Sequence, residues 1–155
     1  MGEAKGTYSN KIVSDKPLTV GIGFYPDLGA CFILMEGNYK ANLYTGYNFS
    51  LDVKTPTGEE YGFWMVPRSG GRFFPCLGPT KKINKHEYWD EFSQFIELLK
   101  KEKYLKCYLI DNKYQSYTFK IDCIGFTKAY EKFLRLNNIE SLPILSTEFL
   151  YNIPE

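Results

Sequence analysis

Residues that could carry out catalysis are few in this chain. His86 is the single histidine, and a Ser or Cys nucleophile needs a base of that kind within reach. Glu59 and Glu60 are adjacent carboxylates, but neighbours on a strand point to opposite faces and do not converge for acid–base work. Gly21 and Gly23 form a Gly-x-Gly pattern without the third glycine of a nucleotide-binding fingerprint. The sequence predicts a protein that is not an enzyme and holds no cofactor.

The four cysteines, Cys31, Cys76, Cys107 and Cys123, are the next candidates for chemistry. No Cys-x-x-Cys pair occurs, so we expect no metal site. Two interpretations remain open: two disulfides formed in an oxidising compartment, or four small core residues in a reducing one. We favour disulfides, because the cysteines fall on or next to predicted strands, where cross-linking is geometrically feasible. The first pairing to test is Cys107 with Cys123 and Cys31 with Cys76, one of three connectivities.

Arg68 and Arg72 form a candidate anion-binding site. They bracket Ser69-Gly70-Gly71, and glycines that expose backbone N–H groups beside two guanidiniums could bind a carboxylate or a phosphate. The alternative is a plain hairpin loop, in which Gly-Gly supplies the positive φ that the turn needs.

Aromatic residues are dense in the first half of the chain. They exceed what one face of a small sheet can easily bury, so some of them are expected at the surface. Tyr44, Tyr47, Tyr61 and Trp64 are the candidate interface residues, because Tyr and Trp bring large contact area and a polar tip to a protein interface. A thick aromatic core is an equally good explanation of the same residues.

Length and charge limit the remaining classes. A chain of 155 residues with 44% hydrophobic and 17% aromatic residues fits one folded domain, 1–155, with 1–15 as a candidate flexible N-terminal segment. Lys and Arg total 19 against 18 for Asp and Glu, which argues against a nucleic-acid partner. No stretch approaches the roughly 18 consecutive apolar residues of a membrane span, and we expect none.

The hydrophobic pattern predicts strands first and helices late. Strands are expected at 20–24, 31–36, 39–44, 49–53, 61–66, 72–76, 105–110 and 114–124. One helix is expected to start at Asn84 and to bury Tyr88, Phe92, Phe95 and Leu99, and a second to start at Thr127. The tail from 140 is expected to pack as extended chain. These elements predict an α+β fold: an antiparallel β-sandwich or half-barrel of short strands with two helices inserted in the C-terminal half.

Residues 121–129, with the sequence IDCIGFTKA, carry a family resemblance. The strand that runs into Gly125-Phe126-Thr127 and on to Ala129 resembles the end of the invasion-associated locus B-like proteins, which are small exported bacterial proteins. The family's Gly-Cys after its first paired cysteine and its early tryptophan beside a cysteine are missing here, so its disulfide pattern is not transferred. The resemblance implies an exported, non-enzymatic protein with an interaction or host-contact role.

Three functional hypotheses follow. The leading one is a periplasmic or secreted protein-interaction domain with a protein partner. The second is a cytoplasmic immunity or antagonist protein that binds and neutralises a toxin, which predicts free thiols. The third is a binder of small anionic ligands that uses the loop from Arg68 to Arg72.

Overall fold

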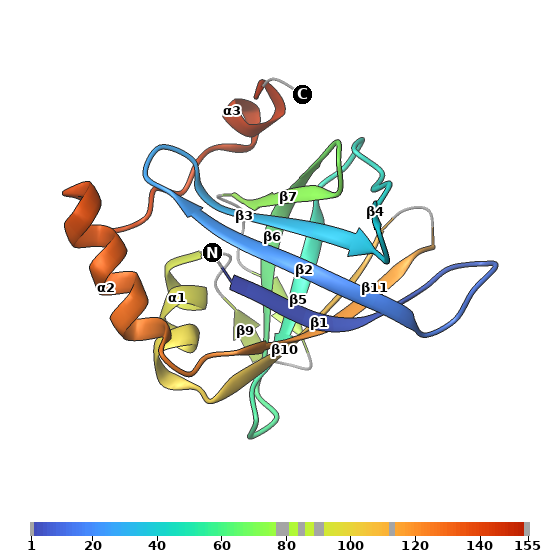
Figure 1. Ribbon diagram of the computed structural model, residues 1–155, viewed down its shortest axis with the longest axis horizontal. Helices are drawn as coiled ribbons and strands as arrows, with labels where there is room; N and C mark the ends of the chain where they lie inside the picture. Colours follow the sequence, from blue (N-terminus) through green and yellow to red (C-terminus); the bar gives the residue numbers. More distant parts are fainter. Residues whose placement is uncertain (1, 77–80, 84–85, 89–91, 112–113, 154–155) are drawn as a thin grey trace.

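The computed structural model describes residues 2–76, 81–83, 86–88, 92–111 and 114–153. Eight strands form a closed antiparallel barrel (Figure 1). In order around the barrel they are β1 (Gly2–Ser9), β2 (Lys16–Tyr25), β3 (Gly29–Glu36), β7 (Arg72–Pro75), β6 (Glu60–Arg68), β5 (Phe49–Lys54), β10 (Tyr104–Ile110) and β11 (Ser116–Asp122). A ninth strand, β4 (Tyr39–Lys40), extends the sheet from β3. Strands β8 (Lys81–Ile83) and β9 (His86–Tyr88) form a separate pair.

The prediction of a sandwich or half-barrel is wrong, because the sheet closes on itself. The strand that the sequence pattern missed is β1, which pairs with β11 on one side and β2 on the other. The segment 1–15, predicted to be flexible, therefore contains a strand that is paired along both edges. With β2 also pairing with β3, none of the eight barrel strands is left as an open edge.

Aromatic side chains fill the inside of the barrel. Along β10 and β11, residues alternate between buried and exposed, as expected when every second side chain points inward. Phe32 stacks on Phe73 with 4.8 Å between ring centroids, and Phe95 contacts Phe63 at 5.4 Å. Phe95 comes from α1 (Phe92–Lys101), whose buried face closes one end of the barrel. The described aromatic side chains therefore pack against one another in the core of the barrel.

Both predicted helices exist, with different starts. His86 to Tyr88 form strand β9, so the first helix does not begin in that region, and Asn84 lies outside the described residues. α1 buries Phe92, Phe95 and Leu99 as predicted. The second helix is α2 (Phe126–Asn137), and its N-cap is Gly125 in the left-handed conformation rather than Thr127. Glycine suits this position because it has no Cβ to clash at positive φ.

The C-terminal tail covers the outer wall of the barrel. Its last turns form a short helix, α3 (Thr147–Tyr151), where the sequence predicted extended chain. Leu150 is fully buried against Val66, Phe74 and Cys76 in a second apolar cluster outside the barrel. Leu145 also forms a parallel bridge with Cys76. The outer face of β6 and β7 is thus part of the core.

The two ends of the barrel differ. One end carries α1 and α2 and is called the helix end here. The other, called the loop end, carries the connections 10–15, 37–38, 41–48, 69–71 and 111–115. In Figure 1 the loop end lies on the right, opposite α1 and α2.

Candidate functional site

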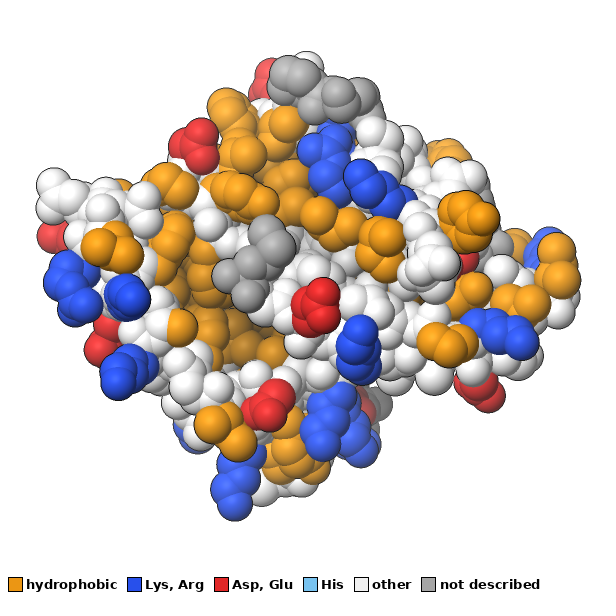
Figure 2. Space-filling view, in the orientation of Figure 1, with side chains coloured by type: hydrophobic (Ala, Val, Ile, Leu, Met, Phe, Trp, Pro, Cys, Tyr) orange, Lys and Arg blue, Asp and Glu red, His pale blue; other side chains and the backbone are white. Residues whose placement is uncertain are grey.

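Exposed hydrophobic side chains gather at the loop end. Among the described residues, six of the eleven large hydrophobic side chains that are exposed belong to its loops or the adjoining strand ends. They are Ile12, Tyr39, Tyr44, Tyr47, Ile110 and Tyr114. Figure 2 shows separate hydrophobic side chains at this end of the molecule, on the right of the view, with basic and acidic side chains among them. Gathering at one end is informative, because single exposed apolar residues are normal on any protein surface.

Direct contacts join three of these loops, 10–15, 41–48 and 111–115. The ammonium of Lys11 lies over the ring of Tyr114, 5.0 Å from its centroid, which links the loops 10–15 and 111–115. The side chain of Gln115 donates a hydrogen bond to the carbonyl oxygen of Asn42 at 3.2 Å, which links 111–115 to 41–48. The rings of Tyr44 and Tyr47 lie 5.7 Å apart.

The segment that carries Tyr44 and Tyr47 is anchored at both ends. Near its start, Gln115 bonds both Asn42 and the carboxylate of the buried Asp111, the latter at 2.7 Å. At its end, the hydroxyl of Tyr151 donates to Asn48 at 2.8 Å. A segment anchored at both ends loses less conformational entropy on binding than a free one. Tyr44 and Tyr47 are therefore ordered before a partner binds.

The buried Tyr117 makes a hydrogen bond near the loop end. The hydroxyl of Tyr117 donates to the carboxylate of Glu36 at 2.7 Å. Burial and the hydrogen bond to Glu36 raise the pKa of Tyr117 well above its usual value, so this hydroxyl remains a donor.

The four predicted interface residues divide between two regions. Tyr44 and Tyr47 are exposed at the loop end. Tyr61 and Trp64 lie half-buried on β6, where Trp64 packs against the second apolar cluster. Sequence reasoning missed Ile12 and Tyr114 as surface residues. Ile12 falls in the segment 1–15 that was a candidate flexible segment, and Tyr114 falls in the expected strand 114–124, so neither assignment indicated an exposed apolar group.

Arg68 and Arg72 are opposite each other in the β6–β7 hairpin but have different surroundings. Arg68 is buried, and its Nη2 donates to the carbonyl oxygen of Ile153 at 2.7 Å. Arg72 is half-buried, and its Nε donates to the carbonyl oxygen of Ser69 at 2.9 Å. One of the two guanidiniums is therefore bound to the C-terminal tail instead of facing a ligand with its neighbour.

All four cysteines are buried free thiols. Cys107 and Cys123 belong to the barrel core, and Cys31 and Cys76 belong to the second apolar cluster. Burial raises the pKa of Cys31 to about 11, and Arg72 opposes this rise in part. Burial, aided by the nearby Asp122, raises the pKa of Cys123 to about 11. Thiols of this kind are poor nucleophiles because the reactive thiolate is scarce.

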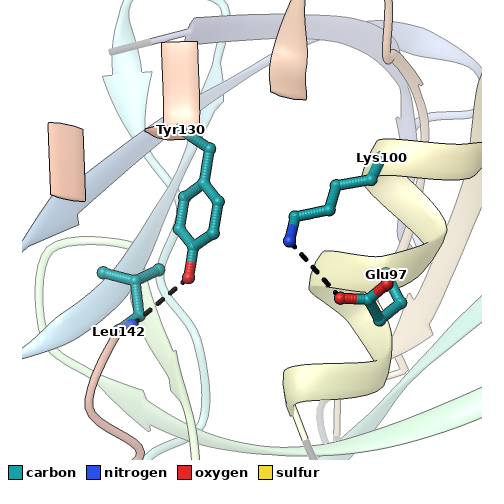
Figure 3. Close-up of polar contacts among 4 residues, drawn as sticks. All are labelled: Glu97, Lys100, Tyr130 and Leu142. Carbon is teal, nitrogen blue, oxygen red and sulfur yellow. Dashed lines mark hydrogen bonds and ion pairs between the residues drawn. The ribbon is translucent and has the colours of Figure 1, made fainter. Parts of the chain in front are cut away.

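A shallow groove of about 220 Å³ separates α1, α2 and residues 140–144. Figure 3 shows the polar groups on its walls. Lys100 lies 3.4 Å from a carboxylate oxygen of Glu97 and 5.3 Å from the ring centroid of Tyr130. The hydroxyl of Tyr130 accepts a hydrogen bond from the backbone N–H of Leu142. These polar groups bond one another, which is typical of a packing seam between elements.

The described part of the chain contains no group of three or more His, Cys, Asp or Glu side chains placed to share a metal ion. It also contains no helix with the length and apolar character needed to cross a membrane.

Comparison of the chain with family models, curated proteins and solved structures finds no match. The resemblance of 121–129 to the invasion-associated locus B-like proteins therefore stays a prediction.

Proposed function

We propose that the protein is a non-enzymatic binding module that docks a partner protein on the loop end of its barrel. The observation that carries this proposal is the set of six exposed Ile and Tyr side chains on one end. A concentration of exposed apolar side chains at one end supports an interaction site, and tyrosine contributes strongly to interface cores because it is large and has few rotatable bonds.

The charges around the loop end suggest the chemistry of the partner. Lys11, Lys16 and Lys40 are exposed there, together with Asp15. A partner surface with an apolar centre and an acidic rim would match this arrangement, because a polar rim surrounds the apolar centre of a typical interface.

Export and host contact remain part of the proposal on the strength of the resemblance alone. A cytoplasmic antagonist of a toxin would use the same loop end and differ in compartment and partner. The anion-binding hypothesis has less support, since Arg68 is bound to the carbonyl oxygen of Ile153.

Replacement of exposed loop-end tyrosines tests the proposal. We expect the variant Tyr39→Ser/Tyr47→Ser/Tyr114→Ser to fold normally, because all three side chains are mostly exposed. Affinity capture from the native host followed by quantitative mass spectrometry should lose the specific partner. With the purified partner, the dissociation constant should weaken at least about tenfold, as expected when interface anchors are removed.

Ile124→Ser/Leu136→Ser is the matched control, since it removes two exposed apolar side chains at the helix end. The control should bind the partner as the wild type does. Equal capture by the wild type and the loop-end variant, or loss of capture in the control alone, would overturn the proposal.

A further inference from the structure

Four lysines lie side by side across four neighbouring strands of the barrel wall. The strand registers place Lys5 opposite Lys120, Lys120 opposite Lys106, and Lys106 opposite Lys54. All four side chains are exposed. Adjacent strands are about 4.8 Å apart, so this lysine row spans on the order of 14 Å. The row crosses four adjacent strands, β1, β11, β10 and β5.

This arrangement costs stability. Like charges directly opposite each other in a sheet repel, whereas Lys opposite Glu or Thr would be neutral or favourable. The ends of the row have some compensation: Lys5 lies 3.9 Å from Glu3, and Lys54 is opposite Glu60 in the register. In the described part of the chain, neither Lys106 nor Lys120 has a carboxylate within ion-pair distance. The ammonium of Lys120 instead lies over the ring of Tyr104, 4.2 Å from its centroid, which compensates its charge in part.

A row of hydroxyl groups runs beside the lysines. Thr7 is opposite Thr118, and Thr118 is opposite Tyr108, each two residues along its strand from a lysine of the row. Since residues two apart in a strand share one face, the ammonium and hydroxyl donors point to the same side of the wall. A groove of about 260 Å³ lies here, lined by Lys54, Lys106, Tyr108 and Thr118 together with Asp52 and Glu60.

We propose that the lysine row binds a linear chain of phosphate groups. Lysine presents a compact charge with three donors, which suits phosphate oxygens, whereas planar carboxylates are matched better by the fork of arginine. A row of donors fits a chain rather than a single ion. Four carboxylates, those of Glu3, Asp52, Glu60 and Asp122, lie on the same face of the wall as the lysines, so the charge balance of the chain gave no sign of the row.

Two ligands share this chemistry, inorganic polyphosphate and the backbone of a single-stranded nucleic acid. Tyr108 distinguishes them, because its ring is 40% exposed beside the row and could stack on a base. Tyr108→Ala should bind single-stranded oligothymidylate severalfold more weakly than Tyr108→Phe, which keeps the ring and also lacks the hydroxyl, if nucleic acid is the ligand. Equal affinities of these two variants for both probes would identify a bare phosphate chain.

Binding of the two probes, measured by fluorescence anisotropy at increasing salt concentration, tests the proposal. Contacts with three or four phosphates should give a slope of about −2 to −3 in a plot of log affinity against log salt. Lys106→Glu/Lys120→Glu should weaken binding of the probe at least about tenfold, and Lys106→Gln/Lys120→Gln should weaken it less.

Lys128→Glu/Lys132→Glu is the matched control, because it makes the same charge change on exposed positions of α2. Thermal unfolding shows whether each variant folds. Failure of the wild type to bind either probe, or equal weakening by the control and the Lys106/Lys120 variants, would overturn the proposal. Lys106 and Lys120 lie four residues along their strands from Ile110 and Ser116, about 13 Å from the loop end, so partner capture should be unaffected.

Discussion

At the scale of single residues, burial determines what reactive groups can do in this protein. Arg68 could have been a ligand-binding arginine by sequence, yet it is buried and bonded to Ile153. The four cysteines could have formed two disulfides or could have been small core residues by sequence, and each is a buried free thiol. The residue types were visible in the sequence, but their surroundings come from strands and a tail that are distant along the chain.

The state of the thiols can be measured directly. We expect no alkylation of the folded protein at neutral pH, because the thiols are buried and protonated. In denaturant without reductant, intact mass should show four alkylated cysteines. Protein made in the cytosol and protein made in an oxidising compartment should give the same result.

Two disulfides in the material from the oxidising compartment would contradict the free-thiol state. Pairing of Cys107 with Cys123 and of Cys31 with Cys76 would then support the first connectivity expected from the sequence. It would also favour the exported interaction domain over the cytoplasmic antagonist.

At the scale of elements, closure of the barrel depends on how closely β1 approaches β11. Gly6 faces Phe119 in the register of this pair. A Cβ built at Gly6 would overlap the backbone carbonyl oxygen of Thr118. A side chain here would push apart the two strands that close the sheet, and the obstacle is backbone that no rotamer change can move.

Replacement of Gly6 by Ala tests this closure. The free energy of unfolding, measured with urea, should fall by about 1–3 kcal/mol or more, as in other overpacked sites. Gly21→Ala on the neighbouring strand β2 is the control. A Cβ at Gly21 would meet Ile33 Cβ at an ordinary distance of 3.9 Å, so its effect should be small. If the two variants lost the same stability, close packing of β1 against β11 would not be the cause.

Local elements were predictable where the pattern was strong. Apolar runs and the turns between them located β2, β3, β5, β6, β7, β10 and β11 to within a few residues. Strict alternation holds for β5, β10 and β11, which bury one face. β1 was missed because its inward positions include the small residues Ala4 and Gly6, which give no hydrophobic alternation. Closure of the barrel could not be predicted without that strand, and this is why the sheet was expected to remain open.

The candidate site was harder to predict than the elements. The loop end combines residues from 10–15, 39–48 and 110–115, which only the barrel brings together. Aromatic density indicated Tyr44 and Tyr47 correctly as exposed groups, but it also indicated Trp64, whose wall position is covered by the tail. Which aromatic residues face water depends on the order of strands and on the path of the tail.

At the scale of the whole molecule, two apolar cores share one sheet. Inward-facing residues form the barrel core, and outward-facing residues of β3, β6 and β7 form a second core under α3. Both cores contain cysteine thiols, and the phenol of Tyr117 is buried near the loop end. Each of these groups is neutral when protonated, so the folded state favours the protonated form.

Stability should therefore decrease in alkaline solution. In the unfolded chain the thiols of Cys31 and Cys123 have a pKa of 9.0, and in the folded protein the pKa is about 11. Above pH 9 the unfolded state releases protons that the folded state retains, so the equilibrium shifts toward unfolding. This contribution to stability is complete below pH 9 and is lost as the pH rises through about 11. Tyr117, whose pKa is also raised, acts in the same direction.

Urea unfolding at a series of pH values measures this effect. The free energy of unfolding of the wild type should fall between pH 9 and pH 11. Cys31→Ala/Cys123→Ala should start from a different stability but show a shallower fall, because two of the responsible groups are absent. The slope against pH is the decisive quantity, since any packing defect of the variant changes the level and not the slope. Parallel curves for wild type and variant would show that the buried thiols do not carry the alkaline sensitivity.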